Sequence, residues 1–442
     1  MDAVFINDKK PHLKTIAEIL QKVYEGSIKK LMISMPPRAG KSYIVSLFCT
    51  WVIGKKEGNA SIMRNAYGLE LAEKFSYDIR EIIKGDKYQK IFPGVRLKQD
   101  KKAVGDWATE ASAQSTYFCG GVQGAITGKG CKDIAILDDP IKNLEEALSE
   151  TILDKTWNWY LSTHKARMET GCPEIHIATR WSKKDPIGML LAEQGKDWIQ
   201  IKIPAIINEK SFCEEIRTTE EYLETRSMVD SSIWEAEYMQ EPVETKGLLF
   251  PMEDLTYFRL KELRGEEVVG VMGYADLADE GDDSFCCVIG YIYNDLVYVV
   301  DVVFTKEPIE VTEAEITQQI IDYKPDVQYF ESNFGGKSFA KTIKRNIDEH
   351  NNTAEKTEDK VTTIIKWKAN TVNKETRILM KSGVIKQRFR FLEKEDRTNA
   401  YEKFIQELTS YIKQGKNKHD DAADGLTGLA ERVYIKKVEF LR

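Results

Sequence analysis

The sequence has few cysteines, and they follow no pattern that would hold a metal or build a disulfide framework. Its 442 residues contain seven cysteines with no CxxC spacing, and Cys286 and Cys287 stand together inside an apolar run. A secreted disulfide-rich domain and a zinc finger are therefore disfavoured. We expect reduced, largely buried thiols in a cytosolic protein.

Long hydrophobic runs are also absent. No uninterrupted apolar stretch approaches the length of about 18 residues that a membrane-spanning helix needs. The amino-terminal sequence MDAVFINDKKPHLK has no basic segment followed by an apolar core, so we expect no secretory signal. The sequence predicts a soluble protein without a membrane partner.

An overall excess of positive charge is the third absence. The formal net charge is -7 and the pI is near 5.6, so any binding to nucleic acid must come from a local patch. Residues 361–391 provide one, with eight basic residues against the single acid Glu375. This basic segment is expected either to grip DNA phosphates or to form a solvated polar face. Its basic residues are Lys366, Lys368, Lys374, Arg377, Lys381, Lys386, Arg388 and Arg390.

The length predicts two domains, because 442 residues exceed the size at which a single core usually stops growing. With 42% hydrophobic residues the chain can bury two cores. The segment 240–251 is rich in proline, glycine and polar residues, which is typical of a domain boundary. We expect one domain at residues 1–240, a linker at 241–256 and a second domain at 257–442.

The first domain is expected to contain a strand, a Gly/Lys turn and a helix in direct succession, which is the context of a phosphate-binding loop. The apolar run 31–35 predicts the strand and residues 42–54 predict the helix. Additional strands before the next acidic motif favour the motor branch of phosphate-loop proteins over the kinase branch. The other elements expected here are helices at 12–24 and 69–83 and strands at 61–66, 115–122, 174–181 and near Trp198.

The turn itself reads MPPRAGKS over residues 35–42. Its last three residues match the GK[ST] core, whereas Met35 stands where the first glycine of the usual loop is expected. Such a loop presents backbone N–H groups to phosphate, with a lysine to counter charge and a hydroxyl for magnesium. The alternative is a coincidental GKS turn. The candidate nucleotide-binding residues are Pro37, Arg38, Ala39, Gly40, Lys41 and Ser42.

An apolar run at 134–137 ends in Asp138 and Asp139, which predicts a central strand with acids at its end. Asp138 would hold magnesium, commonly through water, and Asp139 would polarise the attacking water. Many motors have Glu at the second position. The alternative is that the pair caps a helix beginning near Asn143. Candidates for sensing the γ-phosphate are Arg38, Thr179 and Arg180.

The second domain is expected to begin with three consecutive strands, at 268–276, 284–294 and 296–304. A helix at 312–323 then leads to a strand at 327–332. Three strands, a helix and a fourth strand that carries an acid follow the order of an RNase H-like fold. Residues 350–360 are expected to form a flexible loop.

Acidic residues from three distant segments of this domain can form a two-metal nuclease site. Such a site needs carboxylates that converge on a pair of divalent ions. Singly, each acid could be a surface carboxylate, and His419 is interpreted as a helix-start residue rather than a ligand. The candidate catalytic acids are Asp276, Glu331, Asp420 and Asp421, and the candidate metal ligands are these four and Asp424, with Asp276 expected to bridge both ions.

Together, these motifs resemble those of the large terminase subunit of tailed bacteriophages, and they span most of the chain. The segments that carry the resemblance are PPRAGKS at 36–42, AILDDP at 135–140, ATRWSKKDPIG at 178–188, GYADL at 273–277, FESNFGG at 330–336 and HDDAADGL at 419–426. In this family the phosphate loop often lacks its first glycine and contains an arginine.

The resemblance implies an α/β protein in which a P-loop ATPase of the ASCE type precedes an RNase H-like endonuclease. The implied cofactors are ATP and Mg²⁺, with Mn²⁺ substituting at the nuclease site. The implied activity is ATP-driven translocation of double-stranded viral DNA into procapsids, with metal-dependent cleavage of concatemers. The implied partners are DNA, the portal protein, the procapsid and the small terminase subunit, in the host cytoplasm. A homo-oligomeric ring is implied during packaging, and a monomer is left open for the chain in solution.

Three other functions compete with this interpretation. A helicase-nuclease of DNA repair would need a second motor domain or a helicase motif series, and the sequence contains neither. An inactive prophage remnant that only binds DNA is disfavoured because Lys41 and all three acid positions are intact. A nucleotide kinase would not need the second acidic cluster.

Overall fold

In the computed structural model of the chain, the described residues are 5–124, 126, 128–243, 247–263, 268–277, 284–293, 295–332, 336–413 and 417–435. The chain divides into two compact units. The first unit comprises Met1–Thr225 and Ser231–Glu244, and the second comprises Arg226–Asp230 and Thr245–Arg442. The expected role of residues 241–256 as a linker stays a prediction.

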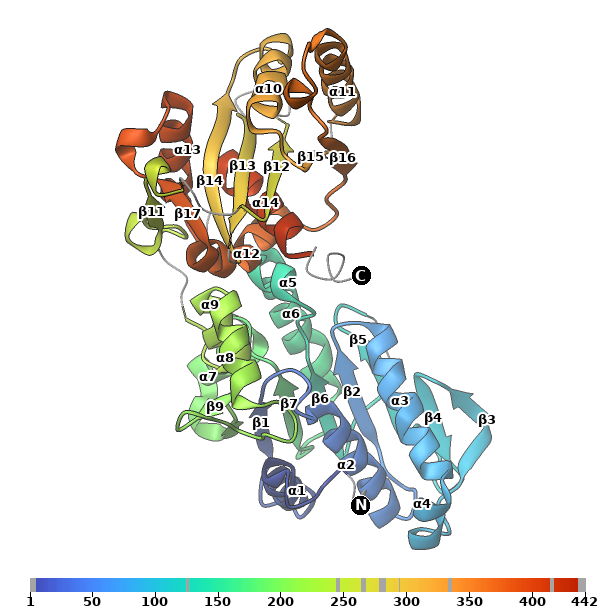
Figure 1. Cartoon of the computed structure of the whole chain (residues 1–442). Coiled ribbons are helices and arrows are strands. Elements are labelled where there is room, and N and C mark those ends of the chain that lie inside the picture. The colour runs from blue at the N-terminus through green and yellow to red at the C-terminus, as the bar shows by residue number, and fades with distance from the viewer. Residues whose placement is uncertain are drawn as a thin grey trace. The chain divides into compact units, whose positions relative to one another are not determined.

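The first unit is built on an eight-stranded sheet in the order β3-β4-β5-β2-β6-β7-β1-β8 (Figure 1). The strands from β5 to β8 in this order are parallel, and β3 and β4 form an antiparallel edge. The strands are β1 Lys30–Ser34, β2 Ile62–Ala66, β3 Leu97–Ala103, β4 Asp106–Thr109, β5 Tyr117–Gly121, β6 Ile134–Asp138, β7 Glu174–Ala178 and β8 Ile199–Lys202.

Helices cover both faces of this sheet, as its buried parallel strands require. In β1, Leu31 and Ile33 face a core that includes α1 and α2, whereas Met32 faces a core with Trp159 and Leu190. This alternation is the two-residue period of a strand. The helices are α1 Pro11–Tyr24, α2 Lys41–Lys55, α3 Leu69–Lys84, α4 Asp86–Ile91, α5 Leu144–Leu148, α6 Glu150–Trp159, α7 Pro186–Gln194, α8 Thr219–Met228 and α9 Ser231–Ile233.

The helices and strands expected in this unit are confirmed, with ends shifted by a few residues. In the sheet, β7 lies between the strand before the phosphate loop, β1, and the acid strand, β6. The β3–β4 hairpin was not predicted, because the sequence of β3, LKQDKKA, is too polar to show strand patterning. A short pair, β9 Ile206–Ile207 and β10 Lys210–Ser211, forms a separate two-stranded sheet.

The second unit contains a seven-stranded sheet in the order β11-β17-β14-β13-β12-β15-β16. Strands β12, β13 and β14 are antiparallel, and β15 and β16 add in parallel beside β12, which is the expected RNase H-like arrangement. The strands are β11 Thr256–Phe258, β12 Gly270–Asp276, β13 Phe285–Tyr293, β14 Leu296–Thr305, β15 Val327–Glu331, β16 Ile364–Lys368 and β17 Phe389–Leu392.

Helices pack on both faces of this sheet as well. On one face, α10 Ile309–Tyr323 and α11 Gly336–Thr353 bury apolar residues against Ala275 and Phe330. On the other face, α14 Asp421–Ile435 lies very close to β12. A Cβ at Gly428 would come within 2.0 Å of the Tyr274 ring, so a larger residue would clash there. The glycine therefore allows the approach that brings α14 to the end of β12. The remaining helices are α12 Lys374–Arg388 and α13 Asn399–Ser410.

Two expectations for the second unit need correction. The prediction of a flexible loop at 350–360 is wrong at its start, because α11 continues to Thr353. A 3₁₀ turn also forms at Thr357–Asp359, within the expected loop. The basic segment contains β16, α12 and β17, none of which its charge pattern revealed.

All seven cysteines are free thiols, and six of them are buried. Across the described residues, no helix has both the length and the apolar character needed to cross a membrane.

Candidate functional site

The phosphate-loop motif forms a tight turn between β1 and α2. Gly40 precedes the first residue of α2 with a φ of 91°, and Arg38 has a φ of 62°. Glycine suits the first of these positions because other residues rarely adopt that backbone conformation. The turn places Lys41 and Ser42 in the first turn of α2, where helix N–H groups can bind an anion. Arg38 is exposed, and Ala39 is buried.

Lys41 and Ser42 reach the acids that the sequence predicted. The Lys41 ammonium donates to Thr179 Oγ1 at 2.7 Å and pairs with Asp139 Oδ2 at 3.2 Å. The Ser42 hydroxyl donates to Asp138 Oδ1 at 3.0 Å. The ends of β1, β6 and β7 thus bring the loop, both acids and Thr179 into one site.

The acid pair does not cap the following helix. Asn143 caps α5 with its own side chain, which accepts from Glu146 N at 3.0 Å. Asp139 has a φ of 44°, and its Oδ1 accepts from Thr179 N at 2.8 Å. Asp138 is fully buried. Asp138 therefore contacts Ser42 and Arg64, Asp139 contacts Lys41 and Thr179, and the capping alternative is not supported.

Arg64, on β2, is a component of this site that sequence reasoning missed. Its guanidinium is buried, donates from Nε to Asp138 Oδ2 at 3.1 Å and lies 3.9 Å from the centre of the Phe75 ring. Burial alone would lower the pKa of Arg64, but the neighbouring Asp138 carboxylate raises it above its ordinary value. The only signal for Arg64 in the sequence was the presence of a charged residue within the predicted strand 61–66.

Arg180, a candidate sensor of the γ-phosphate, is bound by residues of the turn that follows it in the chain. Its Nε lies 3.1 Å and 2.9 Å from the two carboxylate oxygens of Asp185, and its Nη2 donates to Ser182 O at 3.2 Å. Both members of the pair are buried. A sensor role for Arg180 or Arg38 stays a prediction.

In the second unit, Asp276, Glu331 and Asp424 converge. Asp276 ends β12, Glu331 ends the neighbouring parallel strand β15, and Asp424 lies in the first turns of α14. One carboxylate oxygen from each lies within 4.8 Å of the other two. Three carboxylates are the hard oxygen donors that Mg²⁺ and Mn²⁺ prefer, so this site fits such an ion.

The close approach of these acids perturbs their protonation. Burial raises the pKa of Asp276 well above its ordinary value, the Asp424 carboxylate raises it further, and Lys374 opposes the shift. Burial also raises the pKa of Asp424, against the effects of Arg377 and Lys374. A bound cation would favour the ionised form of both groups.

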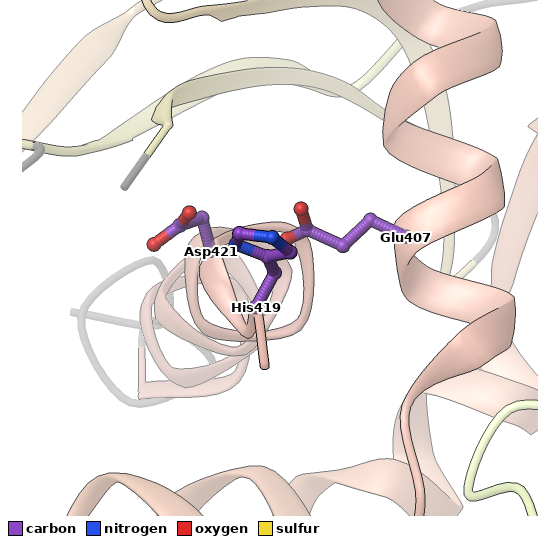
Figure 2. Close-up of side chains that lie close together, drawn as sticks. All are labelled: Glu407, His419 and Asp421. Atoms are coloured by element: carbon purple, nitrogen blue, oxygen red, sulfur yellow. The ribbon is translucent and has the colours of Figure 1, made fainter. Parts of the chain in front are cut away.

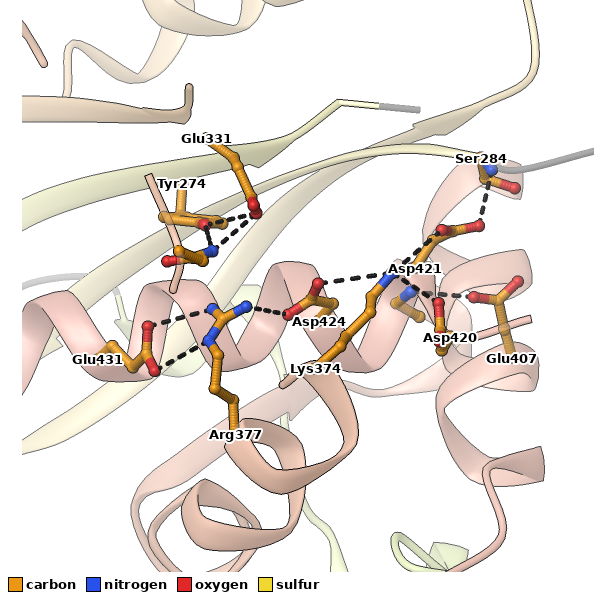
Figure 3. A network of polar contacts seen from close by, with 12 residues as sticks. Tyr274, Ser284, Glu331, Lys374, Arg377, Glu407, Asp420, Asp421, Asp424 and Glu431 are labelled. Carbon is orange, nitrogen blue, oxygen red and sulfur yellow. Dashed lines mark hydrogen bonds and ion pairs between the residues drawn. The ribbon is translucent and has the colours of Figure 1, made fainter. Parts of the chain in front are cut away.

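Two basic residues of α12 enter the acid site (Figure 3). Lys374 Nζ lies 2.6 Å from Asp420 Oδ1 and 3.5 Å from Asp424 Oδ2. Arg377 donates to Asp424 Oδ1 at 2.9 Å and also pairs with Glu431. The basic segment therefore supplies charge directly to the acids.

The two remaining candidate acids lie outside the three-carboxylate group. Asp420 is partly exposed and pairs with Lys374, and Asp421 Oδ2 accepts from Ser284 N at 2.7 Å. Asp421 belongs to a second group, with Glu407 and His419 (Figure 2). Metal binding by Asp420 and Asp421 stays a prediction. Gly335, in the segment 330–336 that carries the family resemblance, lies outside the described residues.

Two polar residues that the sequence did not single out orient Glu331. Asn370 Nδ2 donates to Glu331 Oε2 at 2.7 Å, and the Tyr274 hydroxyl donates to the same oxygen at 3.3 Å. Asn370 follows β16 and Tyr274 lies in β12. No local pattern distinguishes these residues, because only the sheet brings them together.

Other residues of the basic segment lie near this site. Lys366 and Lys368 are exposed on β16. Lys368 also lines a cavity of about 360 Å³, whose lining includes Asn370, Arg377 and Lys381. It shares Asn370 and Arg377 with the acid site. This position supports the interpretation of the segment as a functional surface rather than a solvated face alone.

Comparisons with known proteins agree with this architecture. Residues 275–390 match a family model described as Terminase Bacteriophage T7, Ribonuclease H-like domain. No curated protein matches the chain. The large terminase of a thermophilic bacteriophage, in one of its crystal forms, is 10% identical with a TM-score of 0.54, and the match covers 96% of this chain and 98% of that chain.

Two other structures of the same thermophilic phage terminase are similar to about the same extent. The complex with ATP-gamma-S is 10% identical with a TM-score of 0.51, and the complex with ADP is 11% identical with a TM-score of 0.50. Each match covers 94% of this chain and 98% of that chain. Residues 275–390 therefore match the RNase H-like domain of phage terminases, and the chain has the fold of a large terminase.

Proposed function

We propose that this chain is an ATP-driven motor for packaging double-stranded viral DNA that also cleaves DNA in a metal-dependent reaction. The observation that carries the proposal is the presence of two separate acid sites on one chain of terminase fold. One pairs Lys41 and Ser42 with Asp139 and Asp138, and the other groups Asp276 with Glu331 and Asp424.

In the first site, the loop N–H groups and Lys41 would bind the phosphates of ATP. Lys41 pairs with Asp139, so phosphate would compete for the ammonium and free the carboxylate to polarise water. Ser42 and Asp138 would hold Mg²⁺, which supplies charge neutralisation at the phosphates. Thr179 contacts both Lys41 and Asp139, so its hydrogen bonds would change when phosphate binds Lys41.

In the second site, Asp276, Glu331 and Asp424 would hold Mg²⁺ or Mn²⁺. When bound, such ions supply Lewis acidity and an activated water. Asn370 and Tyr274 keep the Glu331 carboxylate oriented, and Arg377 does the same for Asp424. Lys374 pairs with Asp420 and Asp424 and would reduce the repulsion between the acids.

The assembly expected from the resemblance is part of this proposal. The portal protein, the procapsid and the small terminase subunit would be partners, with a ring of copies during packaging in the host cytoplasm. The thermophilic phage terminase of the same fold was studied in complex with ATP-gamma-S, which supports nucleotide use by this chain. None of the competing functions gains support from these comparisons, since the family model and the structures reported above are those of terminases.

The test uses the purified full chain with plasmid DNA. We expect cleavage with Mg²⁺ or Mn²⁺, loss of cleavage in Asp276→Ala, and retained ATP hydrolysis in that variant. Calcium should bind without supporting efficient cleavage, because its looser coordination positions water and leaving oxygen poorly. A folded parent chain that neither hydrolyses ATP nor cleaves DNA with either ion would overturn the proposal.

A further inference from the structure

A group formed by Glu407, His419 and Asp421 shares no residue with the group of Asp276, Glu331 and Asp424 (Figure 2). Glu407 lies in α13, His419 precedes α14, and Asp421 is the first residue of α14. A ring nitrogen of His419 and one oxygen from each carboxylate all lie within 4.8 Å of one another. Three ligand atoms of two kinds are therefore brought together from α13 and from the segment where α14 begins.

Backbone groups hold both carboxylates of this group in position. Glu407 Oε1 accepts from Ala422 N at 2.9 Å, and Asp421 Oδ2 accepts from Ser284 N at 2.7 Å. Metal-binding carboxylates commonly have such hydrogen bonds, which fix their orientation before the ion arrives. The positions of these two side chains are therefore set by the fold itself.

The imidazole of His419 provides an independent observation. Its Nδ1 is buried and has no hydrogen-bond partner among the described residues. Buried polar nitrogens in proteins nearly always have a partner, and an exception requires an explanation such as an ion. Figure 2 shows the ring between the carboxylates of Glu407 and Asp421. This arrangement differs from that of a histidine that only begins a helix.

We propose that Glu407, His419 and Asp421 form a second divalent-cation site, separate from the three-carboxylate site, that selects zinc or manganese over magnesium. One imidazole nitrogen and two carboxylate oxygens suit zinc, whose sites with three protein ligands keep a position for water. Imidazole is a poor ligand for Mg²⁺, which prefers oxygen. The chain would thus carry an oxygen-only site and a mixed nitrogen–oxygen site.

The local charge balance allows a cation at this position. Lys374 Nζ lies 3.9 Å from Asp421 Oδ1 but only 2.6 Å from Asp420 Oδ1. The lysine is thus engaged mainly by Asp420, and the carboxylates of Glu407 and Asp421 remain to balance the charge of a bound ion. A cation here would tie α13 to the first turn of α14, the helix that also carries Asp424.

This inference does not rest on the proposed nuclease function, because the site can be counted without any DNA. The metal-free full chain would be titrated with Zn²⁺ and with Mn²⁺, and bound ions would be counted by calorimetry and by elemental analysis. We expect His419→Ala and Glu407→Gln each to bind one Zn²⁺ fewer than the parent chain, because the affinity of this site for Zn²⁺ falls at least tenfold. Asp276→Ala should retain it.

The matched control is His350→Ala, which removes a partly exposed histidine of the same unit. This control should bind Zn²⁺ like the parent chain. Equal Zn²⁺ stoichiometry in the parent, His419→Ala and Glu407→Gln chains would overturn the proposal. Failure of DNA cleavage in the parent chain would leave this count unaffected, so the two proposals can fail separately.

A second measurement needs no variant and covers the case in which a substitution prevents folding. X-ray absorption at the zinc edge of the parent chain, loaded with one equivalent of Zn²⁺, reports the atoms that bind the ion. We expect an imidazole signature with oxygen ligands and no sulfur. Sulfur ligands would assign the ion to cysteines, and a spectrum with oxygen alone would assign it to the three-carboxylate site. Either result would overturn the proposal.

Discussion

Arg64 and Asp138 form an ion pair in which neither side chain is exposed to solvent. The same guanidinium donates to Ser46 Oγ at 2.8 Å and to Ser42 O at 2.9 Å. Arg64 therefore connects the end of the acid strand, β6, with the first turns of α2. Because Ser42 and Asp138 are the expected magnesium ligands, this arginine fixes their separation.

Replacing Arg64 by alanine should strongly destabilise the first domain. The change leaves the Asp138 carboxylate buried without its partner, which costs about 3–5 kcal/mol in the free energy of unfolding. The measurement is denaturant unfolding, followed for the transition that ATP shifts, because ligand binding identifies the domain that binds it.

Arg96→Ala is the control, since Arg96 is exposed in the same unit and its loss should change stability by about 0.5 kcal/mol or less. An Arg64→Ala chain as stable as this control would show that the buried pair contributes little.

Replacing Lys41 by alanine should abolish ATP hydrolysis and leave DNA cleavage largely unchanged. The lysine contacts Thr179 and Asp139 of the first site, and loss of one preorganised charge stabiliser reduces turnover by about 10²-fold or more. Both activities are measured on the same preparation, with cleavage assayed in ATP-free buffer. Lys55→Ala removes an exposed lysine from the other end of α2 and serves as control. Loss of cleavage in a folded Lys41→Ala chain would contradict independent sites.

The first unit should lose stability in mild acid because of His164. This side chain is fully buried, with Nδ1 2.8 Å from Asn65 Oδ1, and burial lowers its pKa to about 3. A base with a depressed folded pKa contributes stability above its unfolded pKa, near 6.5. That stability is lost as pH falls through about 6.5 toward 3, by about 1.4 kcal/mol per pH unit.

The prediction is tested by unfolding the parent and His164→Gln chains between pH 7 and pH 4. We expect a steeper pH dependence of the free energy of unfolding in the parent, since glutamine does not titrate. His350→Gln should keep the parental slope. Glu174, whose pKa is lowered to about 2 despite burial because His176 binds it, adds its own acid sensitivity below about pH 4.5, so the informative window is about pH 5 to 6.5.

The sequence alone predicted the parts of the sites whose pattern is local. The turn before Lys41 and the acids that end β6, β12 and β15 follow apolar runs that each mark a strand, and the order of these runs predicts both folds. Arg64 and Asn370 were not assigned, and Lys374 was assigned only to the basic segment, because their contacts depend on which strands and helices become neighbours. The pairing of Asp420 with Lys374 likewise could not be predicted, because these two residues come from different helical segments that only the fold brings together.

The solvent-facing part of the basic segment should bind DNA through phosphates, whereas Lys374 should act at the acids. Replacing Lys366, Lys368 and Lys381 with alanine is expected to weaken binding of unrelated DNA sequences about equally. It should also flatten the dependence of log K on log salt by up to about 0.9 for each phosphate that the variant no longer neutralises. Binding is measured by fluorescence anisotropy across a salt series.

Lys374→Ala should instead reduce cleavage more than binding, because its ammonium pairs with Asp420 and Asp424 rather than lying free on the surface. Lys341→Ala with Lys344→Ala removes exposed charge from α11 as a control for net charge alone. The salt slope separates the two roles, since it follows the number of phosphates that the protein neutralises. An unchanged slope in the triple variant would reduce the patch to a solvated face, and a flattened slope in Lys374→Ala would mean that this lysine also binds the DNA backbone.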